Sequence, residues 1–296
     1  MRSPRHEGLR GKFFRGKFFL ITGGSSGIGF ALASELLARG GRIFIVGLHA
    51  DGVEAALSKL GGRGSNLDGL ACDVGSPDSV ERMAAAVLRS HGVPDVVVNG
   101  AGFATYRTFE QSDMAEVERL LSVNFGGAIR VTKAFLAGMI QRGGGQIVNL
   151  ASIAAALKMT PNGVYCAAKH GMLAWSQCLA LELKRFGVSV SVVCPGRVET
   201  PFFDHETFRM RRQRKETELR VPLAGVVDAL IETIVRRRAV RFVPRYFGAL
   251  AWLAGALPLV QRRLDRLMLS RIDDLYAQSS APALGRPAAD EKRTSQ

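Results

Sequence analysis

Tyr165 and Lys169 have the chemistry and the spacing of a proton-transfer pair. They lie four positions apart in a predicted helix, so both side chains face the same side. A lysine ammonium beside a phenol favours the phenolate and lowers the pKa of the tyrosine. The phenol then donates a proton to a carbonyl oxygen as a hydride reaches the carbon, or accepts one from an alcohol. Alone, this match is a weak signal, because chance often produces Tyr-x-x-x-Lys.

A serine at the end of a strand strengthens the hypothesis. Ser152 lies two residues past an apolar strand predicted at residues 146–150. In α/β folds, the residues that face a ligand follow the ends of the strands. The Ser152 hydroxyl can hold the substrate oxygen there, so the three residues together predict a centre that reduces carbonyls or oxidises alcohols.

The sequence Thr-Gly-Gly-Ser-Ser-Gly-Ile-Gly at residues 22–29 predicts a phosphate-binding turn. A tight strand-to-helix turn uses unusual φ values, and the backbone must approach a pyrophosphate without a Cβ in the way. The following helix offers free N–H groups and the positive end of its dipole. An ordinary glycine-rich turn is the alternative, but the place between the first strand and the first helix favours a cofactor. The candidate contacts are Gly23, Ser25, Ser26, Gly27, Ile28 and Gly29.

Apolar strands alternate with amphipathic helices over most of the chain. This pattern predicts an α/β fold with a doubly wound parallel sheet of the Rossmann type and a C-terminal helical extension. Strands are predicted at residues 18–21, 42–46, 70–74, 94–98, 146–150 and 188–193, and helices at 28–39, 50–60, 77–91, 114–142, 164–185 and 226–238. The predicted organisation is a basic flexible lead-in (1–15), a catalytic domain (16–240), an apolar and basic helical extension (241–278) and a disordered tail (279–296).

The chain resembles the classical short-chain dehydrogenases/reductases over about residues 15–205. The matching features, in order, are the glycine turn, Asp73-Val74, Asn99-x-Ala101-Gly102, Asn124, Ser152, Tyr165-x-x-x-Lys169, Pro195-Gly196 and Thr200. The resemblance implies the Rossmann fold, a nicotinamide cofactor and an enzyme that transfers a hydride between that cofactor and a carbonyl or secondary alcohol.

The resemblance also implies roles for individual residues. Tyr165 is the acid/base, Lys169 tunes it and binds the nicotinamide ribose, and Ser152 orients the carbonyl. Asn124 holds a water that links Lys169 to solvent, or only caps or bridges elements. The implied cofactor contacts beyond the turn are Asp73 and Val74 at the adenine, Asn99, Ala101 and Gly102 along the cleft, Tyr165 and Lys169, and Val198 and Thr200 at the carboxamide. The alternative for Asp73 is a structural role, in which it only starts the next turn.

Two departures from the family pattern affect the cofactor site. The usual Asn-Asn-Ala-Gly has Gly100 at its second position, which we expect to loosen that strand end. The second strand ends in Gly47-Leu48-His49, with neither the acid that binds the ribose of NAD nor the arginine that binds the phosphate of NADP. Asp51 is expected to point away. The missing acid, the small Gly47 and the basic surface favour NADP, with NAD as the alternative; no metal is predicted.

Residues 246–260 carry no charge, and arginines flank them on both sides. A membrane-spanning helix needs about 20 apolar residues, so this segment is too short, and Pro258 interrupts it. It is either a pair of lid helices over the substrate or an interfacial segment with its arginines at anionic headgroups. For the second alternative, the apolar surface is expected from Phe247, Leu250, Trp252, Leu253 and Leu257.

The net charge of +14 favours an anionic partner, and much of the arginine excess lies beyond residue 208. The basic run at residues 209–215 is read as a solvated helix face, as a site for an acidic substrate or headgroup, or as a nucleic-acid contact. Nucleic acid is the least favoured, because no aromatic residues are interleaved with the charges. A hydrophobic fraction of 47% with 22% charged residues excludes a disordered chain.

The four cysteines and the N-terminus predict a cytoplasmic protein. Cys72, Cys166, Cys178 and Cys194 form no CxxC pair and lie among apolar residues, which favours buried free thiols, with disulfides as the alternative. The basic N-terminus lacks the apolar segment and cleavage site of a secretory signal. The expected location is the cytoplasm, either free or peripheral to a membrane.

The leading hypothesis is an NADP-dependent enzyme for an apolar or lipid-like ketone or alcohol, working as a homo-oligomer. A polar or acyl-carrier substrate is the alternative within the same fold. A nicotinamide-binding regulator without catalysis is the alternative from another class, although a sensor has no need of the proton donor.

Overall fold

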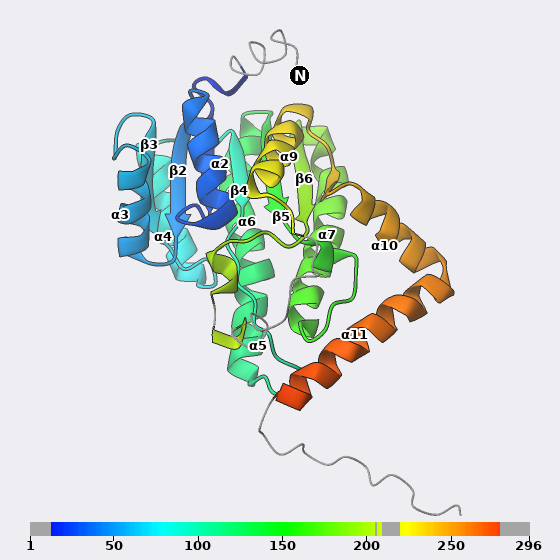
Figure 1. Cartoon of the computed structure of the whole chain (residues 1–296). Helices are drawn as coiled ribbons and strands as arrows, with labels where there is room; N and C mark the ends of the chain where they lie inside the picture. Colours follow the sequence, from blue (N-terminus) through cyan, green and yellow to red (C-terminus); the bar gives the residue numbers. More distant parts are fainter. Residues whose placement is uncertain (1–12, 205, 209–219, 279–296) are drawn as a thin grey trace, which may run out of the picture.

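The computed structural model describes residues 13–204, 206–208 and 220–278. Its strands form one parallel sheet of seven strands in the order β3-β2-β1-β4-β5-β6-β7 (Figure 1). The order reverses between β1 and β4, which confirms the doubly wound α/β fold. The strands are β1 (Phe18–Thr22), β2 (Arg42–Gly47), β3 (Leu67–Ala71), β4 (Val96–Asn99), β5 (Gly145–Leu150), β6 (Val188–Pro195) and β7 (Val240–Val243).

Helices cover both faces of this sheet (Figure 1). One apolar core joins the sheet to α2 (Gly27–Ala38), α3 (Ala50–Lys59) and α9 (Leu223–Arg236). A second core on the other face joins it to α4 (Pro77–Ser90), α6 (Gly127–Gln141) and α7 (Gly163–Leu183). The inner strands are apolar along their whole length because both of their faces are covered; all five residues of β1 are buried.

The long helix predicted at residues 114–142 is divided in the structure. α5 (Met114–Leu121) is joined to α6 by a π-helical turn, Ser122–Gly126. The side chain of Asp113 begins α5 by accepting a hydrogen bond of 2.7 Å from the Glu116 N–H. A π-turn inserts one residue into the helical repeat and often occurs at functional sites. Here it contains Asn124.

The third strand lies three residues earlier than predicted. β3 is Leu67–Ala71, whereas the apolar residues from 70 onward suggested a strand at 70–74. β3 is an edge strand that pairs only with β2, so it does not need a continuous apolar run. The prediction was displaced because it relied on apolar character and gave no weight to Asp68.

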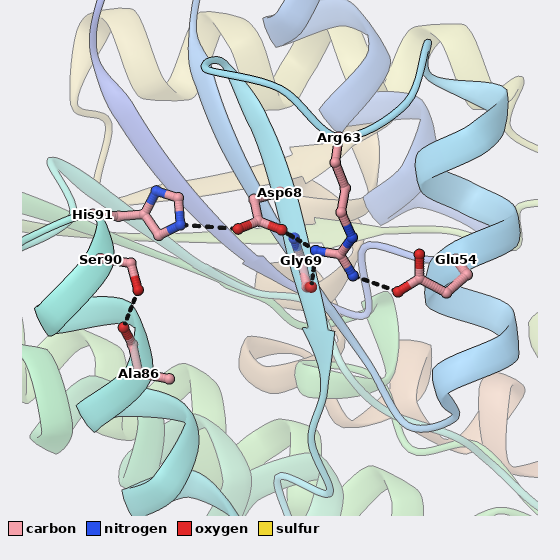
Figure 2. Close-up of polar contacts among 7 residues, drawn as sticks. All are labelled: Glu54, Arg63, Asp68, Gly69, Ala86, Ser90 and His91. Atoms are coloured by element: carbon pink, nitrogen blue, oxygen red, sulfur yellow. Dashed lines mark hydrogen bonds and ion pairs between the residues drawn. The ribbon is translucent and has the colours of Figure 1, made fainter.

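Polar contacts of Asp68 explain its place in the edge strand (Figure 2). Its two carboxylate oxygens bind Arg63 and His91, the latter at 3.1 Å. Arg63 also binds Glu54 of α3 and donates a hydrogen bond of 2.9 Å to the Gly69 carbonyl. These contacts tie α3, β3 and the end of α4 together at this edge, far along the sheet from the catalytic motifs.

The seventh strand was missed in the sequence. β7 pairs with β6 from Val240↔Val192 to Val243↔Pro195 and spans the boundary expected between residues 240 and 241. Arginines crowd this segment and conceal its alternating apolar residues. Arg241 itself lies mostly buried beside Glu232 of α9, at 3.0 Å. The catalytic sheet therefore continues into the segment assigned to the extension.

Two helices follow β7 and project from the body of the protein (Figure 1). They are α10 (Tyr246–Ala256) and α11 (Pro258–Gln278), separated where Pro258 interrupts the apolar segment. Phe247 does not belong to the expected exposed apolar surface: it is buried against the end of β6, where a Cβ on Gly196 would lie 2.8 Å from its ring. Within the described ranges, no helix has the length and apolar character needed to cross a membrane.

The cysteines and the N-terminal lead-in differ in part from what the sequence predicts. Cys178 is exposed on α7 and is not a buried thiol, because it lies on the outer face of that helix; the other three cysteines are buried, and all four are free. The lead-in expected up to residue 15 includes Phe14, which is fully buried and packs against Phe19. Residues 1–12, the basic run at 209–215 and the tail at 279–296 lie outside the described residues.

Candidate active site

The glycine turn after β1 is shaped by contacts that exclude side chains. A Cβ on Gly29 would lie 2.2 Å from the carbonyl oxygen of Gly23, and one on Gly23 would lie 2.8 Å from the backbone of Gly100. Gly23 and Gly27 also have positive φ values of 69° and 53°. Only glycine combines these conformations with so close an approach of backbone to backbone.

The first turn of α2 faces the cavity at this edge of the sheet. Ser26, Gly27, Ile28 and Gly29 line that cavity, and Ser26 makes no side-chain capping bond. The free N–H groups and the positive helix end are therefore directed at the space where a phosphate would lie. These features fit the diphosphate of a nicotinamide cofactor.

Ser152, Tyr165 and Lys169 meet in the same cavity. Ser152 follows β5, and its side chain hydrogen-bonds to the phenol of Tyr165 on α7. Lys169 lies one helical turn after Tyr165, with its Nζ 5.6 Å from the centre of the phenol ring. The ammonium donates a hydrogen bond of 3.1 Å to the Leu150 carbonyl. The predicted catalytic residues are thus brought together by one strand end and one helix face.

Burial shifts the pKa values of Tyr165 and Lys169. Enclosure raises the pKa of Tyr165 above its usual value, against the hydrogen bond from Ser152, which lowers it. Burial therefore acts against the lowered tyrosine pKa expected from the sequence, because it favours the neutral phenol. Burial also lowers the pKa of Lys169 to about 8. At neutral pH the phenol is protonated and can act as an acid.

Asn124 lies fully buried beside the lysine. Its Nδ2 donates to the carbonyls of Phe103 at 2.8 Å and Leu120 at 3.1 Å, while its Oδ1 has no hydrogen-bond partner. A Cβ on Gly102 would lie 2.5 Å from that Oδ1 and 3.7 Å from Lys169 Nζ. Both polar atoms therefore border one small space, and a buried acceptor without a donor there is suited to an ordered water.

Two predicted cofactor residues, Asp73 and Val74, are not among the described residues that line the cavity. Asp73 is held by Arg119 at 2.8 Å and by the Gly75 N–H at 2.8 Å. Burial alone would raise the pKa of Asp73, but these two bonds lower it below its usual value. Val74 is buried and packs against Gly127 of α6, where a Cβ would approach its side chain to 2.7 Å.

The residues after β4 act mainly through the backbone. Asn99 donates its amide to Thr132 at 3.0 Å and to Asn149 at 2.8 Å, so its side chain lies inside the protein. The N–H groups of Gly100 and Ala101 bind Thr22 Oγ1 at 3.1 and 3.2 Å. The strand end expected to be loose at Gly100 is therefore held to β1. Of these residues, Gly100 and Gly102 reach the cavity.

The cavity has a volume of about 450 Å³, and its lining lies between Gly23 and Phe208. Val198 and Thr200 line it as predicted, and a Cβ on Gly27 would lie 3.3 Å from Thr200. Among the described residues, none of those that line the cavity belongs to α10 or α11. The sequence analysis missed an apolar wall formed by Phe103, Met159, Phe202, Phe203 and Phe208. Two of these phenylalanines, Phe202 and Phe203, come directly after Thr200-Pro201, which was the available signal.

Comparisons with known proteins agree with this geometry. The family model described as short chain dehydrogenase matches residues 17–210. The chain belongs to the short-chain dehydrogenase family. It is therefore an NAD(P)-dependent oxidoreductase with the Rossmann fold that the motifs predicted.

Individual members of the short-chain dehydrogenase family show how close the likeness is. A putative ketoacyl reductase of Streptomyces coelicolor is 40% identical over 185 residues, which cover 62% of this chain and 70% of that one. D-threitol dehydrogenase of Mycolicibacterium smegmatis is 39% identical over 185 residues, covering 62% and 71%. A crystal structure of an actinorhodin polyketide ketoreductase variant with NADPH is 30% identical, with a TM-score of 0.70, and the match covers 77% of this chain and 95% of that one.

Proposed function

We propose that this protein is an NADP-dependent reductase or dehydrogenase that interconverts an apolar ketone and its secondary alcohol. The observation that carries the proposal is the meeting of Ser152, Tyr165 and Lys169 with the glycine turn in one cavity. When bound, the nicotinamide ring supplies or accepts the hydride. The side chains of this protein hold the substrate and transfer the proton.

The residues divide the proton chemistry among them. Ser152 holds the substrate oxygen, and Tyr165 donates the proton to it during reduction or accepts one during oxidation. Lys169 carries the positive charge that stabilises the phenolate after transfer. Asn124 Oδ1 holds a water beside Lys169, through which the proton is replaced. Gly23 and the start of α2 bind the diphosphate end, and Val198 and Thr200 lie at the nicotinamide end.

The wall of the cavity favours an apolar substrate. Phe202 lies 6.0 Å from Tyr165 between ring centres, and Phe203 and Phe208 extend the wall at 5.2 Å from one another. Aromatic side chains bury large apolar areas and give little to a polyhydroxylated substrate. A ketone on an acyl carrier is the second candidate, because a relative at 40% identity is a putative ketoacyl reductase and the net charge of +14 suits an acidic carrier.

A panel of ketones tests this function. NADPH oxidation is followed with long-chain and cyclic ketones, with a polyhydroxylated ketone and with a 3-oxoacyl thioester. We expect the apolar ketones to give the highest kcat/KM. Faster turnover of the polyhydroxylated ketone would contradict the apolar assignment, and faster turnover of the thioester would favour the second candidate.

NADPH should bind more tightly than NADH, by severalfold. The end of β2 cannot hold the acid that would select NAD, because a Cβ on Gly47 would lie 2.6 Å from Ser25 Oγ and 2.8 Å from Val53. The Ser25 hydroxyl lies at the same point and offers a donor to the additional phosphate. Fluorescence titration of the protein with each reduced cofactor measures the difference. Tighter binding of NADH would reverse the assignment.

We also propose that α10 and α11 attach the protein to anionic membranes. Trp252 and Leu259 are 71% and 74% exposed, and Leu253 and Leu257 are exposed beside them. Burying each such side chain contributes roughly 1.5–3 kcal/mol. The neighbouring exposed arginines, Arg262, Arg263 and Arg266, add about 1 kcal/mol each near anionic lipids.

Vesicle co-sedimentation tests the attachment. The substitutions Trp252→Ser and Leu259→Ser together should lower binding to phosphatidylserine vesicles at least tenfold, whereas Leu88→Ser, an exposed position on α4, should not. High salt should weaken binding without abolishing it, because part of the attraction is Coulombic. Equal pelleting of all three proteins would contradict the proposal.

We further propose a homo-oligomer, as the sequence predicted. Leu121, Ile129 and Leu181 are exposed on α5, α6 and α7, where a second copy would cover them. Sedimentation of the same proteins without lipid reports the oligomeric state, for which we expect a dimer or a tetramer.

A further inference from the structure

A second cavity lies on the far side of the catalytic tyrosine. It has a volume of about 190 Å³ and is formed by the segment after β4 and by residues 160–165 at the start of α7. Ligand sites usually measure about 300–1,000 Å³, so this cavity is too small to bind a typical ligand alone. Its size fits one substituent, or arm, of a substrate whose remainder lies outside this cavity.

Asn162 and Tyr165 line both cavities. The two cavities therefore share part of their wall, and the residue that transfers the proton belongs to that wall. The first cavity must also hold the cofactor, with its reactive end beside Val198 and Thr200, which leaves limited room there for the substrate. A ketone whose carbonyl is bound at Tyr165 has the phenylalanine wall on one side and the second cavity on the other.

The side chain of Asn162 has an unused polar atom at this junction. Its Oδ1 is buried and has no hydrogen-bond partner. Asn162 precedes α7 as its N-cap residue, yet its side chain makes no capping bond. Asparagine is favoured at that position because its side-chain oxygen caps the helix, so an asparagine whose Oδ1 accepts no bond has given up the usual stabilisation. A buried polar atom without a partner is rare in proteins and points to a missing ligand group.

We propose that Asn162 is a specificity-determining residue, and that the two cavities together form a substrate site with two arms. One arm of the ketone lies against the phenylalanine wall, and the other enters the second cavity. The Asn162 amide hydrogen-bonds to a neutral polar group on the carbon next to the reacting carbonyl, since an amide both donates and accepts. The preferred substrate class is therefore a ketone with an adjacent hydroxyl or amide. This inference rests on the proposed function and makes its substrate more specific.

Two ketones of equal length test the hydrogen bond, one with a hydroxyl next to the carbonyl and one without it. We expect Asn162→Ala to lower kcat/KM for the hydroxyketone about tenfold and to change that for the plain ketone less than twofold. The midpoint of thermal unfolding should not change, because no capping bond is lost. Equal losses with both ketones, or none with either, would overturn the role of Asn162.

Substitutions that fill the second cavity test whether one arm of the substrate enters it. Gly163 and Val164 line it without lining the first cavity, and a Cβ on Gly163 would have no atom within 4 Å. Gly163→Leu and Val164→Phe should each lower kcat/KM for hydroxyketones with a long second arm at least tenfold, and spare those with a methyl group there. Gly225→Leu on α9, also without a neighbour within 4 Å, is the matched control.

The possible outcomes separate the inference from the function. If neither cavity variant changes the dependence on arm length, the two-armed site is wrong while the proposed function stands. If the unmodified protein reduces neither ketone with NADPH, the proposed function is wrong and the inference falls with it.

Discussion

Replacing Tyr165 with Phe should lower kcat by about 10²–10⁴-fold, the range that general acid–base catalysis contributes. The variant loses only the hydroxyl group. The ring keeps its packing 6.0 Å from Phe202, and Lys169 keeps its hydrogen bond to the Leu150 carbonyl. Because the glycine turn is untouched, the Kd for NADPH should stay within about threefold of that of the unmodified protein.

Steady-state kinetics and a fluorescence titration measure the two quantities in the same preparation. Tyr246→Phe is the matched control, since this tyrosine is half exposed on α10, away from the cavity. Comparable turnover by the Tyr165→Phe variant would remove Tyr165 from the proton-transfer step. An unmodified protein that binds NADPH but reduces none of the ketones would instead favour a nicotinamide-binding regulator.

Gly29→Ala should abolish cofactor binding and destabilise the fold. The added methyl group would lie 2.2 Å from the Gly23 carbonyl oxygen and 3.1 Å from the Gly24 Cα, both of which are backbone atoms. Such overpacking typically costs about 1–3 kcal/mol. The turn must open to relieve it, and that movement displaces the N–H groups directed at the phosphates.

We expect the Kd of this variant for NADPH to rise at least 100-fold, with a lower midpoint of thermal unfolding. Gly225→Ala in the first turn of α9 is the control, because a Cβ there meets no atom within 4 Å. That substitution should leave cofactor binding unchanged and raise stability slightly, as alanine favours helix. Unchanged NADPH binding by Gly29→Ala would contradict the assignment of the turn.

The parts of the fold that could be predicted are those in which local pattern and tertiary structure agree. The inner strands are apolar because both of their faces are covered, and the glycine turn is visible because its backbone contacts admit no Cβ. β7 was missed because Arg241 and its neighbouring arginines conceal the strand. The charge of Arg241 is accommodated beside the core by its ion pair with Glu232 of α9, which the sequence does not show. β3 was displaced for the corresponding reason, since Asp68 depends on Arg63 and His91.

In the candidate site, too, the residues that could be predicted are those whose local sequence pattern agrees with the tertiary structure. Ser152, Tyr165 and Lys169 could be found because their spacing reflects one strand end and one helix face. The phenylalanine wall and Asn162 were not assigned, because the position of a side chain on a cavity wall depends on how several loops fold together. The protonation of Tyr165 is a similar case, because a sequence shows the nearby lysine but not the burial of the phenol, which raises its pKa.

The central claim is that the chain transfers a hydride to a carbonyl carbon while Tyr165 supplies the proton. The most direct test uses NADPH deuterated at the transferred position of the nicotinamide ring, the apolar ketone that the protein reduces fastest, and mass spectrometry of the product. The account predicts an alcohol with one deuterium on the carbinol carbon for the unmodified protein, and almost no product for the Tyr165→Phe variant. Product alcohol without deuterium, or equal labelled product from both proteins, would contradict it.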